Sequence, residues 1–208
     1  MTLFKLEKVN FKEIVSYPDL EIEKGKVTFI AGESGTGKST LFKLLNGVFT
    51  PTAGEITYEG EELSAYDSIE LRRKNLLVGQ SAVLFEEDSI KENFLTFFDY
   101  RDLEPLSEEE MVELLTLCSI DMPLNKEVYH LSGGEKQRVF IAIHLALGFE
   151  VLMLDEPTSA LDAKNAHTLL SNVKAYCEKK GKTLLVISHD QEMVNEFADN
   201  VITLGGET

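Results

Sequence analysis

The sequence predicts an α/β domain in which a mostly parallel sheet is flanked by helices and a helical subdomain is inserted into the chain. Short apolar runs alternate with longer segments of helical periodicity, which is typical of parallel strands joined by helices. The stretch 81–130 differs, because it has few β-branched runs and its apolar residues recur at helical spacing. We therefore expect a helical insertion within an α/β core.

Five apolar runs are the strand candidates of the core. They are 26–31, 76–78, 151–155, 183–188 and 201–204. One helix is expected at 163–180, where periodic apolar residues leave one face to be buried, and another after Ser107, which forms a capping box with Glu110. The expected division is a single domain, 1–208, with a core of 1–80 and 132–208 and a helical subdomain at 81–131.

Composition and charge limit the possible partners. The 208 residues are 43% apolar, as in a folded globule, and the 20 basic and 36 acidic residues give a formal charge of -16. Such a surface repels nucleic acid and anionic lipid, so we expect direct binding to neither. No apolar run approaches the roughly 20 residues that span a bilayer, and the N-terminus lacks the features of a signal peptide, so a cytoplasmic location is expected. Cys118 and Cys177 have no metal-ligand spacing and are interpreted as buried thiols.

A glycine-rich loop is the first motif that carries chemistry. Residues 32–39, GESGTGKS, follow an apolar strand and lead into a helix that carries Leu41, Leu44 and Leu45. In such a loop, glycines let successive backbone amides curl around phosphates, and the helix N-terminus adds partial positive charge. Lys38 reaches the β- and γ-phosphate oxygens, and the Ser39 hydroxyl is a ligand for Mg²⁺. The alternative is a plain glycine-rich turn. The predicted nucleotide contacts are Gly32, Ser34, Gly35, Thr36, Gly37, Lys38, Ser39 and Thr40.

Two adjacent carboxylates end the apolar run 151–155. Neighbouring side chains on a strand point to opposite faces, so Asp155 and Glu156 can serve different atoms. We expect Asp155 to be a Mg²⁺ ligand and Glu156 to polarise the attacking water as general base. Taken alone, the pair is also consistent with a solvated strand end.

A second helix terminus resembles a known family signature. Residues 131–138, LSGGEKQR, look like the signature of ABC-type ATPases, and the match in order and spacing includes Gln80 as the Q-loop, 159–162 as the D-loop and His189 as the H-loop histidine. Taken singly, Gln80 is also consistent with a polar strand end and His189 with a buried imidazole. The resemblance implies the ABC ATPase fold, with a P-loop NTPase core.

The resemblance also implies how the residues work. Two subunits pack head to tail, and ATP with Mg²⁺ lies between the phosphate loop of one and the signature helix of the other. Ser132, Gly133 and Gly134, together with Asp162, are then nucleotide-binding residues, with Ser132 and Gly134 on the γ-phosphate in trans. His189 contacts the γ-phosphate in cis, and Gln80 senses Mg²⁺ and the attacking water.

The adenine site departs from the family pattern. Family members stack the base on an aromatic residue after the first strand, and here that loop is shortened to 11–15. Phe11 is the first candidate and Tyr17 the next, while Phe11 is equally consistent with a core residue. The guanine-reading motif is missing, so ATP is the expected nucleotide.

The expected role is that of an ATP-hydrolysing transporter subunit, which forms a homodimer on binding ATP and docks under a separate membrane protein at the inner face of the cell membrane. The compact chain resembles small stand-alone bacterial cassettes, and 127–204 resembles subunits of iron or metal exporters. A regulator of a membrane protein, of the type that controls cell-wall enzymes, is the alternative. A chromosome-clamp ATPase needs a long coiled coil and a translation factor needs tandem cassettes, and this sequence has neither.

Aromatic residues are concentrated after Gln80, in the region where the resemblance places the docking site for a coupling helix of the membrane partner. They are Phe85, Phe94, Phe97, Phe98 and Tyr100. Most are expected in the core and some in a groove that receives an apolar helix. Glu86, Glu87 and Asp88 are expected to guide a basic partner loop.

Overall fold

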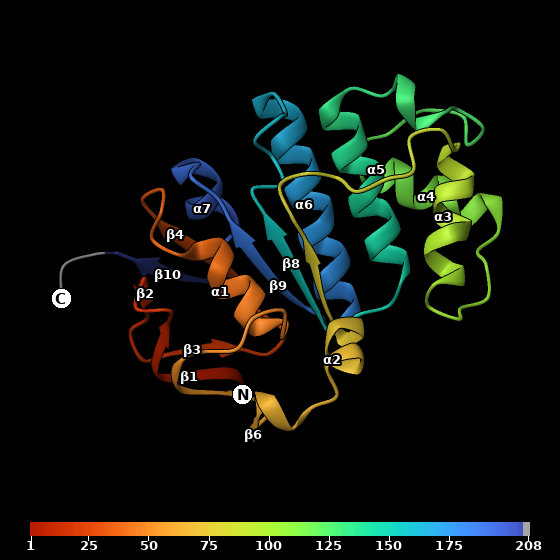
Figure 1. The fold of residues 1–208 in the computed structure, drawn as a ribbon. Helices are drawn as coiled ribbons and strands as arrows, with labels where there is room; N and C mark the ends of the chain where they lie inside the picture. Colours follow the sequence, from red (N-terminus) through yellow and green to blue (C-terminus); the bar gives the residue numbers. More distant parts are fainter. Residues whose placement is uncertain (206–208) are drawn as a thin grey trace. The chain divides into compact units, whose positions relative to one another are not determined.

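The computed structural model describes residues 1–205, which fold into two five-stranded sheets and their helices (Figure 1). The chain divides into two compact units. The first contains 1–77, 149–156 and the described residues from Cys177 onwards, and the second contains 78–148 and 157–176. The second unit includes the segment 81–131 together with the helix that follows it.

The predicted parallel sheet is confirmed. Its strand order is β10-β4-β9-β8-β7, and the pairs β10 with β4, β4 with β9 and β8 with β9 are parallel. The strands are β4 (Val27–Gly32), β7 (Asn75–Val78), β8 (Val151–Asp155), β9 (Thr183–Ile187) and β10 (Asn200–Leu204). Every residue of β8 and β9 is buried, which explains why both strands are continuous apolar runs in the sequence.

The first unit also contains an antiparallel sheet, which the sequence analysis did not predict. Its long central strand pairs with three others. The strands are β1 (Thr2–Phe11), β2 (Val15–Ser16), β3 (Leu20–Glu23), β5 (Ala53–Tyr58) and β6 (Glu61–Glu62). Buried Phe4 and Leu6 alternate with more exposed Lys5 and Glu7, so β1 carried a readable strand pattern, whereas β2 and β6 are too short to show one.

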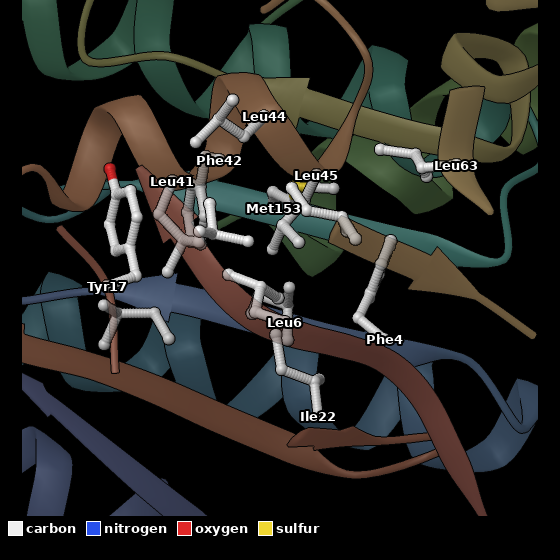
Figure 2. Packing of buried hydrophobic residues seen from close by; sticks show 14 of the residues in the cluster. Phe4, Leu6, Tyr17, Ile22, Leu41, Phe42, Leu44, Leu45, Leu63 and Met153 are labelled. Carbon is white, nitrogen blue, oxygen red and sulfur yellow. The ribbon is translucent and has the colours of Figure 1, made fainter. Parts of the chain in front are cut away.

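Helix α1 (Lys38–Leu45) joins both sheets in one core (Figure 2). Its predicted apolar residues, Leu41, Leu44 and Leu45, are fully buried, as expected. They belong to a cluster that includes Phe4 and Leu6 from the antiparallel sheet and Met153 from β8. Because α1 begins at Lys38, this packing fixes the end of the glycine-rich loop.

Capping boxes start the main helices of the second unit. The predicted box of Ser107 with Glu110 is confirmed, and equivalent boxes lie at Ser89 and Ser132. Besides α1, the helices within residues 1–205 are α2 (Ser68–Lys74), α3 (Ile90–Asp99), α4 (Glu108–Leu117), α5 (Gly133–Ala146), α6 (Ala163–Lys180) and α7 (Gln191–Phe197), with 3₁₀ turns η1 (Leu63–Ala65) and η2 (Val128–His130). Helix α6 has the predicted bounds. Within residues 1–205 no helix has the length and apolar character needed to cross a bilayer.

Both cysteines are buried free thiols, as expected from the sequence. Burial raises the pKa of the Cys177 thiol to about 12 and that of Cys118 further. Neither thiol is ionised near neutral pH, so neither is a reactive nucleophile in the folded chain.

His144 is a buried titratable group within α5. Its Nδ1 atom lies 2.8 Å from the carbonyl oxygen of Phe140, and its ring packs against those of Phe140 and Phe97 at centroid distances of 4.3 and 5.9 Å. Burial, with a smaller contribution from the nearby Arg101 guanidinium, lowers the pKa of His144 to about 4. The imidazole is therefore neutral at pH 7, and the contact to the carbonyl oxygen assigns its proton to Nδ1.

This pKa predicts an acid-sensitive stability. An unfolded histidine titrates near pH 6.5, so between pH 6.5 and 4 the unfolded chain binds a proton that the folded chain does not, and stability falls as pH falls. We expect His144 to account for about 2 kcal/mol of lost stability between pH 7 and pH 5. Urea unfolding at both pH values should show a smaller difference for His144→Met than for the unmodified chain. Equal differences would contradict the depressed pKa.

Candidate functional site

The glycine-rich loop holds a buried ammonium group. Lys38, the first residue of α1, is only 6% exposed, and its Nζ donates to the carbonyl oxygens of Gly32 at 2.9 Å and Glu33 at 2.7 Å. The Thr36 hydroxyl donates to the same Glu33 carbonyl at 2.9 Å. The loop is thus closed on itself around a fixed positive charge, as a phosphate-binding loop requires.

Two glycines of the loop are required by their surroundings. Gly32 and Gly37 both have positive φ angles, 142° and 91°. A side chain at Gly32 would collide with the carbonyl oxygen of Leu204, and a Cβ atom at Gly37 would lie 2.7 Å from Val15 Cγ1. The backbone amides can therefore adopt this curl only with glycine at both positions.

The adjacent carboxylates at the end of β8 are arranged differently from the expectation. The strand ends at buried Asp155, and Glu156 lies outside it with a φ of 51°, in the left-handed region that non-glycine residues seldom adopt. The direction of Glu156 is therefore set by this turn, and the expectation that strand alternation sets it is wrong. The Glu156 amide donates to the carbonyl oxygen of Ile187 at 3.1 Å, which anchors the turn to β9. Strained residues of this kind are concentrated at functional sites.

His189 lies against Glu156. Its Nε2 is 3.1 Å from Glu156 Oε1, and the two side chains are 48% and 26% exposed. The buried imidazole that its sequence setting also allowed is therefore not what the structure contains. In the parallel register Asp155 is opposite Ile187, so the segments that follow β8 and β9 leave the sheet at the same edge. Such an edge is where α/β sheets place ligand-binding residues.

The aromatic candidates for the adenine site are both buried. Phe11 belongs to the core and stacks on Phe49 with a centroid distance of 4.9 Å, which supports the core alternative. Tyr17 donates its hydroxyl to the carbonyl oxygen of Gly37 at 2.9 Å, and burial raises its pKa. The Tyr17 hydroxyl thus stabilises the phosphate loop at Gly37. Ile14, in the preceding turn, is the exposed apolar residue of this segment. The sequence analysis did not single out Ile14, although an apolar residue at a turn was a signal that could have pointed to it.

The glycine-rich start of α5 lies in the second unit. Ser132 is the N-cap, its hydroxyl accepts from the Glu135 amide at 3.3 Å, and Glu135 accepts from the Ser132 amide at 2.7 Å. These bonds with Ser132 hold the pKa of Glu135 below its usual range. Ser132 and Gly133 are exposed, whereas Gly134 is buried and a Cβ there would lie 2.9 Å from Leu161 Cδ2. Glycine at 134 therefore allows the D-loop to approach the helix.

Gln80 and Asp162 lie in the same unit as this helix start. Gln80 is exposed and follows the last residues of β7. The Asp162 carboxylate accepts from the backbone and side-chain amides of Asn165 at 3.0 and 2.5 Å, and these bonds lower its pKa. The residues predicted for the site therefore form two groups. The phosphate loop, Asp155, Glu156 and His189 belong to the first unit, and Gln80, 132–134 and Asp162 belong to the second.

Comparison with known proteins identifies the family. A family model described as ABC transporter matches residues 15–159. The L-cystine import ATP-binding protein TcyC of Bacillus subtilis is 34% identical over 203 residues, which are 93% of this chain and 81% of that protein. The probable iron export ATP-binding protein FetA of Escherichia coli is 32% identical over 97% of this chain and 91% of its own length.

A solved structure agrees with these relatives. The ATP-binding cassette MJ0796, in a dimeric post-hydrolysis state bound to ADP and Pi, superimposes with a TM-score of 0.84 at 30% identity over 97% of this chain and 94% of that chain. The chain therefore belongs to the ABC transporter family of ATP-binding proteins. It is an ABC-type ATPase, and ATP is its nucleotide.

The position of Lys38 predicts the effect of removing its charge. Lys38→Ala should weaken ATP binding about 100-fold or more, because the loop amides alone must then hold the triphosphate. Isothermal calorimetry measures the affinity. The matched control is Lys43→Ala in the same helix, whose ammonium lies over the Phe49 ring and should not affect binding. An unchanged affinity in Lys38→Ala would contradict the assignment of the loop.

Proposed function

We propose that this chain is the ATP-hydrolysing subunit of a transporter, in which two copies close on ATP and drive a separate integral membrane subunit. The observation that carries the proposal is the arrangement in the first unit. A buried ammonium is fixed inside the phosphate loop, and a carboxylate paired with a histidine follows the neighbouring strands. The loop provides for phosphate binding and the pair provides for activation of water.

Magnesium fits the donors that the first unit offers. The Ser39 hydroxyl follows the phosphate loop, and the Asp155 carboxylate ends β8. Oxygen donors of this kind, completed by nucleotide phosphates and water, are the ligands that Mg²⁺ prefers. When bound, the ion would neutralise charge on the phosphates, with Ser39 and Asp155 as its protein ligands and Gln80 as a further contributor.

Glu156 is the proposed general base. A carboxylate that takes a proton from water must be held in place. Glu156 is held by the hydrogen bond from its backbone amide to the Ile187 carbonyl oxygen and by its contact with His189. His189 then orients the carboxylate and contacts the γ-phosphate. The strained φ angle of Glu156 is the cost of aiming the side chain away from the strand.

Head-to-tail pairing of two copies would complete the nucleotide site. The exposed Ser132 and Gly133, with Gly134, start a helix whose first amides lack intrahelical partners, and this suits a phosphate supplied by the partner copy. Asp162 would contribute to the same interface. The solved cassette that this chain resembles is dimeric with ADP and Pi.

Transport is favoured by the relatives. TcyC is named for L-cystine import and FetA for probable iron export, so the chain resembles motors of transport in both directions. The proposed location is the cytoplasmic face of the membrane, reached through the membrane subunit. The net charge of -16 fits neither nucleic acid nor anionic lipid as a direct partner.

Replacing the proposed base tests the mechanism. Glu156→Gln should bind ATP normally but hydrolyse it about 100-fold more slowly, because an amide cannot take the proton. With the chemistry blocked, gel filtration with ATP should show a dimer, and adding Ser132→Arg should abolish it. Glu150→Gln, directly before β8, is the matched control, since Glu150 pairs with Lys182. Normal turnover of Glu156→Gln would exclude it as the base.

An aromatic surface in the second unit suits the membrane partner. Phe94 and Phe98 are buried, Phe97 is half-buried, and Phe85 and Tyr100 are 42% and 67% exposed, so the expectation that most of the five rings are core residues is wrong. The rings of Phe85 and Tyr100 lie 6.4 Å apart. A hollow of about 500 Å³ adjoins Tyr100, and its apolar lining includes Leu95 and Leu103. Exposed aromatics beside a hollow are suited to anchoring a short helix.

The acidic edge of this surface is partly neutralised. Glu86, expected to guide a basic partner loop, instead pairs with Lys136 at 2.6 Å. The proposed affinity therefore comes mainly from Phe85 and Tyr100.

Truncation of these rings tests the docking surface. The double variant Phe85→Ala/Tyr100→Ala should keep the ATPase rate of the free subunit but lose co-purification with the membrane protein, because each exposed anchor contributes about 2 kcal/mol or more. Tyr129→Ala, an equally exposed ring on η2, is the control. Loss of both activities would show that the rings support the fold, and unchanged capture would place docking elsewhere.

A further inference from the structure

The segment that carries Gln80 is joined to the signature helix by side chains. Residues 80–85 form no regular element, and Gly79 and Glu86 flank them. Gln137, one turn into α5, donates its Nε2 to the carbonyl oxygen of Gly79 at 2.9 Å. The preceding residue of α5, Lys136, forms the 2.6 Å ion pair with Glu86. Two consecutive residues of one helix thus hold both sides of the Gln80 segment.

A second side-chain amide closes the same segment. Asn93, buried in α3, accepts from the Phe85 amide at 2.9 Å and donates to the Phe85 carbonyl oxygen at 3.0 Å. In addition, the amide of Tyr129 donates to the carbonyl oxygen of Glu86 at 2.8 Å, so η2, which precedes Ser132, is attached to it as well. The segment around Gln80 and the start of α5 are therefore connected by several short, directed bonds.

Packing alone does not account for glutamine at position 137. The side chain is 5% exposed, and its Oε1 is buried with no hydrogen-bond partner among the described atoms. An apolar side chain of the same shape would avoid the cost of burying an unsatisfied acceptor. The feature that an apolar side chain cannot replace is the N–H bond to Gly79, the residue directly before Gln80.

From these contacts we infer that Gln137 is a positioning residue for ATP hydrolysis, which sets the place of Gln80 through the Gly79 carbonyl and, with Lys136, makes the Gln80 segment move together with the signature helix. The inference rests on the role proposed for Gln80. Its consequence is that movement of α5 on dimer closure is transmitted directly to Gln80, which links the trans contact of Ser132 to the water-sensing residue of the same copy.

The test compares two amide-to-carbonyl bonds of the second unit. Gln137→Met removes the donor and keeps the volume, whereas Asn172→Leu removes the equivalent 2.8 Å bond to the Leu117 carbonyl, which does not involve the Gln80 segment. We expect Gln137→Met to lower kcat about tenfold with KM and the calorimetric ATP affinity unchanged. Hydrogen exchange at 79–85, followed by mass spectrometry, should accelerate in Gln137→Met. In Asn172→Leu, kcat and this exchange should both stay normal.

Two further variants keep the result decisive. If Gln137 acts only through Gln80, the double variant Gln80→Ala/Gln137→Met should have the kcat of Gln80→Ala alone. Lys136→Met, at a partly exposed site, removes the ion pair with Glu86 and should also accelerate hydrogen exchange at 79–86. It replaces Gln137→Met in the exchange experiment if that variant is too unstable.

The outcomes separate the two proposals. Normal turnover of Gln80→Ala would overturn the role proposed for Gln80. A slow Gln80→Ala with a normal, folded Gln137→Met, or losses in kcat that multiply in the double variant, would overturn the positioning role alone. Unchanged hydrogen exchange in both Gln137→Met and Lys136→Met would show that these two side chains do not hold the Gln80 segment to α5.

Discussion

The parallel register of β4, β9 and β8 is the constraint on which the site depends. In this register Ile30 is opposite Ile187 and Ile187 is opposite Asp155, so the three strands end at one edge. The phosphate loop leaves β4 at that edge, Asp155 ends β8 with Glu156 directly after it, and His189 follows β9. Because side chains on a strand alternate with a period of two, a slip of one residue in β8 would turn Asp155 to the wrong face. A slip in any of the three strands would also displace the site segment that follows it. The buried apolar sequences of β8 and β9 stabilise that register from both faces.

Within the site, contacts of the chain itself hold charges and strained backbone in place. Lys38 is bonded to two loop carbonyls, and Glu156 is anchored to Ile187 and contacts His189. Positive φ angles at Gly32, Gly37 and Glu156 are maintained by the core beneath them, in which α1 packs against both sheets. Groups fixed in this way need little reorganisation when charge develops on the phosphate and the attacking water.

The second unit contributes a different kind of order. Three of its helices, α3, α4 and α5, begin at capping boxes, and its functional segments are joined by side-chain amides and an ion pair rather than by strand pairing. Bonds of this kind are directed but individually weak, so a group of them can shift together when a helix moves. A unit that is joined in this way is suited to relaying movement between a nucleotide and a docked partner.

Local patterns in the sequence were enough to predict the parallel strands, the phosphate loop, the capping box of Ser107 and the family, because each depends on neighbouring residues: apolar runs, glycine spacing, and a hydroxyl three residues before a carboxylate. They did not predict the antiparallel sheet, since the pairing of β1 with β5 joins residues about fifty positions apart and two of its strands are only two residues long. The turn that aims Glu156, the burial of Phe11 and the bond from Gln137 to Gly79 are defined only in the folded chain. Each of these depends on contacts between segments distant in the sequence, whose geometry no local pattern contains.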